Sequence, residues 1–204
     1  SDDFFCECER LLEQEPIETL DELKSAIEFR NQHAFNLPSK VAAFKGAFHG
    51  KTRGSLATTY NRDARLPFIA NNPDATFIDD ADEFTTKIDT WQSHYWYIEF
   101  SPLRLVKKPI NQLAAVIYEP IQGEGGVVPL SASHNALLRH IKAQYPSTAI
   151  IADEIQCGLG RTGAFLESVA NDTPNDYITL AKSLGGGLCK ISALAVEKSR
   201  YHNE

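Results

Sequence analysis

The sequence of 204 residues predicts an α/β fold, with a mostly parallel sheet that helices cover on both faces. Three observations carry this prediction. Short, fully apolar runs recur between residues 113 and 196, which is typical of strands buried on both faces of a sheet. An amphipathic segment separates the first two runs, as in a strand-helix-strand unit. Polar residues and glycines follow the runs, and ligands bind at this edge of parallel sheets.

Local signals predict the elements of the first half of the chain. A helix is expected from Thr19 to about Asn31, because Thr19 and Glu22 form a capping box and the apolar residues that follow fall on one face. The aromatic stretch 91–100 has no clear period and receives no assignment. The further elements expected here are strands at 41–44 and 75–78 and an acidic helix at about 80–90.

The second half of the chain alternates more regularly. A helix over residues 131–144 is expected to turn Ala136, Leu137, Leu138 and Ile141 inward. The strands are expected at residues 113–118, 148–152, 177–181 and 191–196.

Chemically active side chains follow three of these strands. Glu119 follows the first, Asp153 the second and Lys182 the third, and glycines come after each. Taken alone, an Asp after a strand is typical of a helix N-cap, and a lone Lys of a solvated surface. Together at one edge of a sheet, they favour a ligand site. The loop Gly185-Gly-Gly-Leu-Cys-Lys190 lacks the spacing of a phosphate loop for nucleoside triphosphates.

Charge and composition exclude several classes of protein. The formal net charge of −7 argues against a nucleic-acid or anionic-membrane partner. No apolar run reaches the roughly 18 residues that span a bilayer, and no signal peptide opens the sequence, so a cytoplasmic protein is expected. The four cysteines are too few for a disulfide framework. Cys6-Glu-Cys8 lacks further ligands at metal-binding spacing, so no metal site is expected.

Four segments together resemble the class-III aminotransferases, which are enzymes that use pyridoxal 5′-phosphate. The likeness runs from about residue 40 to residue 196. It implies the large domain of a pyridoxal-phosphate-dependent transferase with the aspartate-aminotransferase fold, called fold type I. The segments are GAFHGKTRGSLATT at 46–59, EPIQGEGG at 119–126, DEIQCGLGRTG at 153–163 and AKSLGGG at 181–187.

The resemblance also implies roles for individual residues. Lys182 is similar to the Schiff-base lysine, and Asp153 to the carboxylate that faces the pyridine nitrogen. Gln156 is similar to the amide that bonds the 3′ oxygen of the cofactor, with a solvent-facing loop amide as the alternative. Phe48 matches the aromatic ring stacked on the cofactor, with ordinary core packing as the alternative, and His49 lies beside it.

Two glutamates complete the expected site. Glu119 resembles the family's glutamate beside the cofactor, and Glu124 the one that pairs with a substrate-specificity arginine. The family's phosphate-binding turn is expected near residues 7–24, where this sequence has no glycine. After the lysine, Cys189-Lys190 replaces the proline of the family pattern.

The function that the resemblance implies is transfer of an amino group from an ω-amino donor, such as ornithine, acetylornithine or 4-aminobutyrate, to a 2-oxo acid such as 2-oxoglutarate. A homodimer is expected. Alternatives are a decarboxylase or aminomutase with the same cofactor, and a truncated, non-catalytic interaction domain. Residues 1–204 are expected to be a single cofactor-binding domain without linker or repeat. Because the sequence starts with Ser and contains no Met, it is expected to be incomplete, without the family's N-terminal segment and C-terminal small domain.

Overall fold

The computed structural model describes residues 2–12, 16–71 and 75–201. The chain forms two compact units, one from Ser1–Ser39 with Trp91–Gln112 and one from Lys40–Thr90 with Leu113–Glu204. Each unit is therefore built from two separate stretches of sequence. The assignment of residues 1–204 to one domain stays a prediction, and the units are described one at a time.

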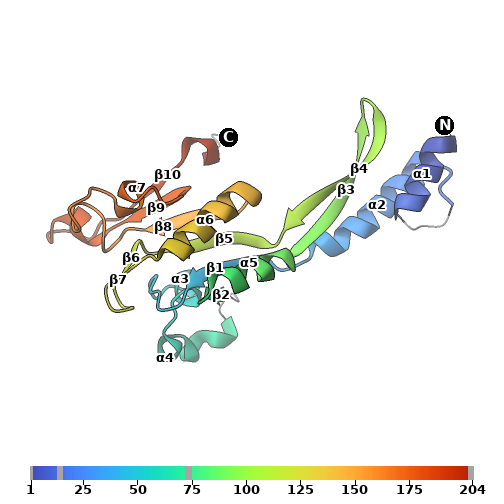
Figure 1. Cartoon of the computed structure of the whole chain (residues 1–204). Coiled ribbons are helices and arrows are strands. Elements are labelled where there is room, and N and C mark those ends of the chain that lie inside the picture. Colours follow the sequence, from blue (N-terminus) through green and yellow to red (C-terminus); the bar gives the residue numbers. More distant parts are fainter. Residues whose placement is uncertain (1, 13–15, 72–74, 202–204) are drawn as a thin grey trace. The chain divides into compact units, whose positions relative to one another are not determined.

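The larger unit is built on a six-stranded sheet with the strand order β10-β9-β8-β5-β1-β2. All neighbouring strands run parallel except β10, which pairs antiparallel with β9 at one edge (Figure 1). This confirms the mostly parallel sheet expected from the apolar runs. The strands are β1 (Lys40–Phe44), β2 (Ala75–Ile78), β5 (Leu113–Tyr118), β8 (Ala149–Asp153), β9 (Tyr177–Leu180) and β10 (Ala193–Val196).

The centre of this sheet forms the core of the unit. In the pairing of β5 with β8, Val116 lies opposite Ile150 and Tyr118 opposite Ala152. All four side chains are buried. These four lie on one face of the sheet, because register partners and alternate residues of a strand point the same way. On the other face Ala115, Ile117, Ala149 and Ile151 are half-buried, so the sheet is covered in part there as well and the two strands read as continuous apolar runs.

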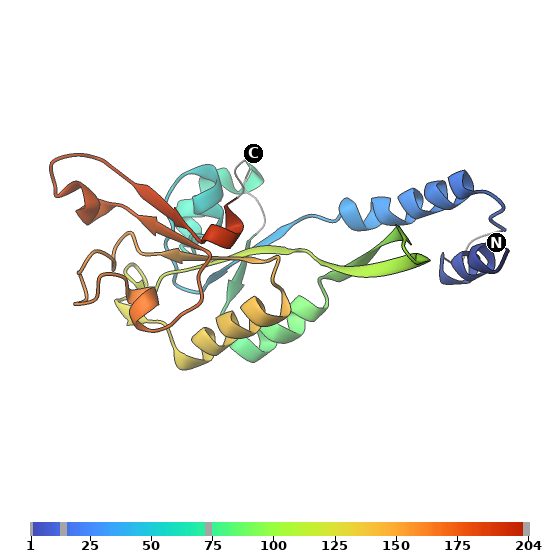
Figure 2. The same ribbon diagram turned by 90° about the horizontal axis from the view of Figure 1, so that it is seen from above.

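Two helices lie side by side along one face of the sheet, α5 (Ala81–Asp89) and α6 (Ala132–Gln144). The segment with α3 (Arg53–Ala57) and α4 (Arg62–Arg65) lies on the other face (Figure 2). The side chain of Asp80 accepts hydrogen bonds from the N–H groups of Asp82 and Glu83 and so starts α5. In α6, Leu137, Leu138 and Ile141 are buried as expected. Ala136 is exposed, which corrects its expected inward position.

Ala136 is exposed because it precedes the buried face of α6 by one residue. Consecutive helix positions are turned by about 100°, and Leu137, Leu138 and Ile141 cluster within about that angle, so Ala136 lies on the far side of the helix from their centre. The remaining short elements of this unit are η1 (Leu66–Asn71), β6 (Ile121–Gln122), β7 (Val128–Pro129), α7 (Glu167–Ala170), η2 (Lys182–Gly185) and η3 (Lys198–Arg200), where η marks a 3₁₀ turn.

The smaller unit contains α1 (Asp2–Leu12), α2 (Leu20–Phe35) and the hairpin β3 (Gln92–Phe100) with β4 (Leu103–Asn111). The capping box of Thr19 and Glu22 starts α2 as predicted, and the helix continues to Phe35, beyond the expected end at Asn31. A small core of buried side chains joins the elements: Cys8, Leu12, Ile17, Leu23 and Ile27.

The unassigned aromatic stretch is strand β3. Trp96 and Ile98 pack against the small core, while Tyr95 contacts Phe35 of α2 with ring centroids 5.6 Å apart. Since aromatic side chains occupy both faces of the strand, the sequence lacks the alternation that marks a half-buried strand. Among the described residues, no helix is long and apolar enough to cross a membrane.

Candidate active site

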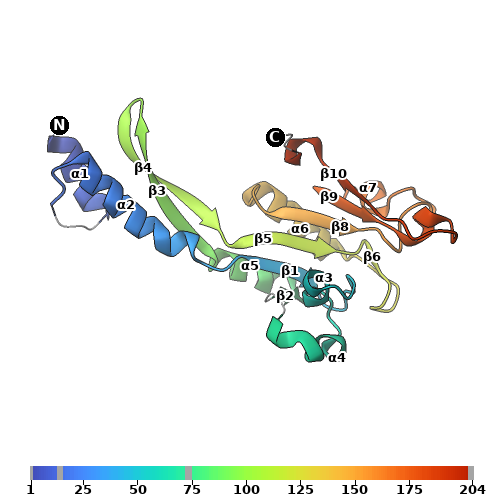
Figure 3. The same ribbon diagram turned by 180° about the vertical axis from the view of Figure 1, so that it is seen from behind.

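The loops that follow β1, β5, β8 and β9 carry the predicted site residues at the carboxyl edge of the sheet (Figure 3). The strand order reverses at β1, because the chain places β2 on one side of β1 and β5 on the other. In open α/β sheets, such a reversal leaves a crevice beyond the carboxyl ends of the strands, where ligands bind. The topology thus places the predicted residues where a ligand site is expected.

Asp153 and His49 form a buried pair at this edge. Nδ1 of His49 lies 2.8 Å from Oδ2 of Asp153, and neither side chain is more than 7% exposed. The other oxygen of Asp153 accepts hydrogen bonds from the hydroxyl of Thr179 and the N–H of Ile155, both at 3.2 Å. The carboxylate is therefore held in one orientation by groups from three segments. Nε2 of His49 is buried and has no hydrogen-bond partner among the described residues.

Glu119 is buried directly after β5 and braces two loops. Its carboxylate accepts hydrogen bonds from the N–H of Phe48 at 3.0 Å and from the N–H of Gly123 at 3.2 Å. Burial raises the pKa of Glu119 above its ordinary value, although these two N–H donors act in the opposite direction. Glu119 thus links the loop after β1 to the loop after β5.

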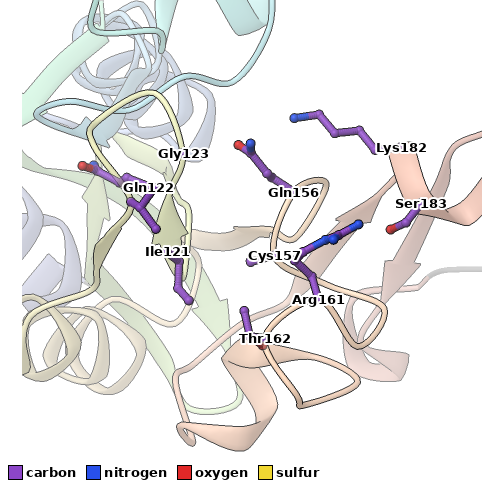
Figure 4. A pocket seen from close by; sticks show the side chains of 10 residues that line it. Ile121, Gln122, Gly123, Gln156, Cys157, Arg161, Thr162, Lys182 and Ser183 are labelled. Atoms are coloured by element: carbon purple, nitrogen blue, oxygen red, sulfur yellow. The ribbon is translucent and has the colours of Figure 1, made fainter.

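Lys182 and Gln156 line a pocket of about 500 Å³. Figure 4 shows the side chain of Lys182 reaching into this pocket toward the end of Gln156. The amide of Gln156 lies directly against Gly123, so a side chain at position 123 would have to displace this amide. The remaining lining residues come from the same loops: Ile121, Gln122, Val127, Cys157, Arg161, Thr162 and Ser183.

The backbone of Lys182 is unusual. Its φ angle of 45° lies in the left-handed region, which residues other than glycine rarely adopt. Strained backbone of this kind clusters at functional sites, where the surrounding structure holds a side chain in a required direction. The observation agrees with a special role for this lysine, whose side chain is exposed at the pocket.

Phe48 and Glu124 line a separate pocket of about 420 Å³, together with Lys51 and Tyr60. Phe48 is half-buried and Glu124 is exposed. The predicted residues thus form three groups: Lys182 with Gln156, Asp153 with His49, and Glu119 with the backbone of Phe48. Among the described residues, the structure records no contact between Glu124 and either of the first two groups, although Glu124 belongs to the same loop as Gly123.

Sequence reasoning missed two residues of the site. Thr179 interrupts an apolar strand with a hydroxyl that orients Asp153, and a lone polar residue in a buried strand could have indicated this. Glu154 is 1% exposed, and its carboxylate accepts hydrogen bonds from the N–H groups of Glu167 and Ser168. No local signal separated it from Asp153, because adjacent acidic residues look alike in a sequence.

The expected phosphate-binding turn has a different structure. Residues 7–12 belong to α1 and residues 20–24 to α2, and residues 13–15 lie outside the described residues. The described part of this stretch therefore contains no glycine turn at the start of a helix.

The fold is shared with solved transaminase structures. A crystal structure of ornithine aminotransferase from Toxoplasma gondii, with pyridoxal phosphate partially occupying its active site, matches this chain with a TM-score of 0.63. The sequence identity is 22%, and the match covers 97% of this chain and 44% of that one. The chain has the transaminase fold of type I.

The family is defined by sequence. The family model for class-III aminotransferases matches residues 19–202, and the chain belongs to this family. It is 38% identical over 183 residues to the mitochondrial acetylornithine aminotransferase of Saccharomyces cerevisiae, covering 86% of this chain and 39% of the relative. It is 33% identical over 159 residues to the acetylornithine aminotransferase of Mycolicibacterium smegmatis, covering 78% and 35%. The chain spans about two fifths of the length of these curated relatives.

Proposed function

We propose that the protein is a pyridoxal-phosphate-dependent aminotransferase that moves an amino group from an ω-amino donor to a 2-oxo acid. The donor would be of the ornithine, acetylornithine or 4-aminobutyrate type, and the acceptor 2-oxoglutarate or a similar acid. The observation that carries the proposal is the placement of Lys182 and Asp153 at the carboxyl ends of the adjacent strands β9 and β8. Membership of the class-III family supports it.

The residues present fit the reactive end of the cofactor. Lys182 supplies an amine at the mouth of a pocket, and Asp153 supplies a carboxylate that is buried and already oriented. The unpartnered Nε2 of the buried His49 is a further polar atom at this edge. When bound, pyridoxal phosphate would supply an aldehyde and an electron-withdrawing ring.

Each residue then has a defined task. The Nζ of Lys182 would hold the aldehyde covalently and later carry a proton between the two reacting carbons. A carboxylate of Asp153 would hold the proton on the ring nitrogen, and the bonds from His49 and Thr179 keep that carboxylate in place. The amide of Gln156 would bond the 3′ oxygen, which agrees with its position opposite Lys182 in the pocket.

Three further residues would act around the ring. Phe48 would stack on one face of the cofactor, and its backbone is already held by Glu119. Glu124 would take part in distinguishing substrates, because it is exposed in a pocket that also contains Lys51. We also propose that the active form is a homodimer, which the resemblance to the family supports.

The decisive experiment uses borohydride reduction of the purified protein after incubation with pyridoxal phosphate. We expect peptide mass spectrometry to find the cofactor mass on the peptide that carries Lys182, and Lys182→Ala to lose both this adduct and turnover. Lys190→Ala is the matched control, because Lys190 is a neighbouring exposed lysine that shares a smaller pocket with Lys182. Retained transamination by Lys182→Ala would refute the assignment.

A further inference from the structure

The loop between β8 and α7 supplies much of the pocket wall. We call residues 155–166 the pocket loop. Gln156, Cys157, Arg161 and Thr162 all line the pocket with Lys182. The outer part of the loop is closed on itself, since the N–H of Leu159 bonds the carbonyl of Phe165 and the N–H of Gly160 that of Ala164. It can therefore move as one piece unless something holds its ends.

Glu154 holds both ends. One oxygen of its carboxylate accepts from the N–H of Ser168 at 2.7 Å, and the other from the N–H of Glu167 at 3.1 Å. The second oxygen also accepts from the thiol of Cys157 at 3.3 Å, near the start of the loop. The first residues of α7 thus receive their acceptor from Glu154, and the residue before the helix, Leu166, offers no capping side chain.

The backbone of Glu154 is tied to the sheet. Its N–H donates to the carbonyl of Thr179 at 3.1 Å, and its carbonyl accepts from the N–H of Gly158 at 2.9 Å. Gly158 approaches so closely that a Cβ there would lie 2.8 Å from the carbonyl oxygen of Glu154. One buried residue therefore connects the strand end that carries Asp153 with both ends of the pocket loop.

We infer that Glu154 is a positioning residue, which sets the place of Gln156 and of the pocket loop by holding the loop ends to the sheet. The inference rests on the proposed function for its consequence at the cofactor. Buried charged acceptors are strong, and replacing one by an amide leaves N–H donors facing an NH₂ group. Loosening of the loop should therefore move Gln156, while Lys182 and the contacts of Asp153 with His49 and Thr179, which lie outside the loop, are retained.

The first measurement needs no cofactor. Trypsin cleavage after Arg161, in the pocket loop, is compared with cleavage after Arg139, in α6, by mass spectrometry of the native protein. We expect Glu154→Gln to raise the ratio of the two rates by about tenfold, because the loop opens locally. Glu154→Asp keeps the negative charge, so its cleavage ratio should lie between those of Glu154→Gln and the wild type. A ratio unchanged in Glu154→Gln would overturn the inference.

A second variant and a matched control separate positioning from folding. Gly158→Ala should raise the same ratio, because the new methyl group pushes the loop away from Glu154 without removing any charge. Asp176→Asn is the control, since Asp176 is as buried as Glu154 but lies at the amino end of β9, away from the pocket loop. It should weaken the fold, and α6 with it, because Asp176 bonds Lys142 of that helix. The rate of cleavage after Arg161 itself should stay as in the wild type.

The second measurement is titration with pyridoxal phosphate, followed by absorbance. We expect Glu154→Gln and Gly158→Ala to bind the cofactor about tenfold more weakly than the wild type, and Asp176→Asn to bind it normally. Faster cleavage with unchanged cofactor affinity would overturn the positioning role. Absence of binding by the wild type would instead refute the proposed function. The cleavage ratios would still test whether Glu154 anchors the pocket loop.

Discussion

Asp153 and Glu154 are adjacent and both buried, and their side chains have no hydrogen-bond partner in common among the described residues. Asp153 is the last residue of β8 and contacts His49 and Thr179, whereas Glu154 contacts the backbone at the start of α7. Successive side chains at a strand end point to opposite sides. This alternation separates Asp153, the proposed cofactor contact, from Glu154, which we infer to anchor the pocket loop.

The role proposed for Asp153 predicts a loss of rate with little loss of cofactor. Asp153→Asn keeps the shape of the side chain but removes the negative charge that would hold the proton on the ring nitrogen. We expect kcat to fall by at least about a hundredfold, because stabilisation in the transition state is lost. Steady-state kinetics and cofactor titration measure the two effects. Asp172→Asn, at an exposed carboxylate paired with Arg139, is the control, and equal rates for Asp153→Asn and the wild type would reject the role.

The buried carboxyl group of Asp176 should make the free energy of unfolding depend on pH. Burial alone would raise the pKa of Asp176, but hydrogen bonds from Lys142, the N–H of Ile150 and Arg200 together lower it below the ordinary value of 3.8. A group with a lowered pKa stabilises the fold above its ordinary pKa, and this contribution is lost as the pH falls through the lowered pKa.

We therefore expect Asp176→Asn to reduce the free energy of unfolding by about 3 kcal/mol at pH 7, because two cations lose a buried partner. The difference from the wild type should shrink below pH 3.8, where the carboxyl becomes protonated in the unfolded chain. Urea unfolding at several pH values measures this. A difference that stayed constant down to acid pH would contradict the role of the charge.

At the scale of elements, Asn31 joins helix α2 to strand β3. Its amide donates to the carbonyl of Trp96 and accepts from the N–H of the same residue, both at 2.7 Å. A single side chain thus satisfies both backbone groups of one strand residue on the side that faces the helix. These two hydrogen bonds join α2 to β3 beside the small apolar core of the unit.

We expect Asn31→Ala to destabilise this unit by about 2 kcal/mol, because two backbone groups lose their partner. The tryptophan fluorescence of the chain reports on this unit, since both tryptophans, Trp91 and Trp96, belong to it. Urea unfolding followed by fluorescence measures the loss. Asn36→Ala, at the end of the same helix, is the control and should change the stability by much less. Equal effects of the two variants would argue against the bridge.

Element positions followed closely from the sequence where local signals were strong. The strands β5, β8 and β9 and the helix α6 lie within one residue of the predicted bounds, because continuous apolar runs and a Ser N-cap mark them. Strand β3 was missed because its aromatic residues do not alternate. Helix α1 and strand β4 received no assignment either.

At the scale of the whole molecule, the proposed homodimer has a direct test. We expect sedimentation equilibrium of the purified protein with pyridoxal phosphate to give the mass of two chains, because homodimers with a two-fold axis are the commonest assemblies. Lys182→Ala serves as a control for dependence on the cofactor. A concentration-independent mass of one chain would contradict the proposal.

The sequence by itself determined the class of fold, the family resemblance and the residues proposed for the site, because apolar runs, glycines and the motifs around Asp153 and Lys182 are local patterns. Tertiary structure alone decided which of these residues meet. His49 contacts Asp153 across 104 positions of sequence, and Glu119 holds the backbone of Phe48 across 71. Such contacts depend on the strand order and on the course of the loops, which follow from packing of the whole sheet. Local patterns therefore indicated which side chains could take part in the site. Only the fold showed that Asp153 and its neighbour Glu154 have different contacts.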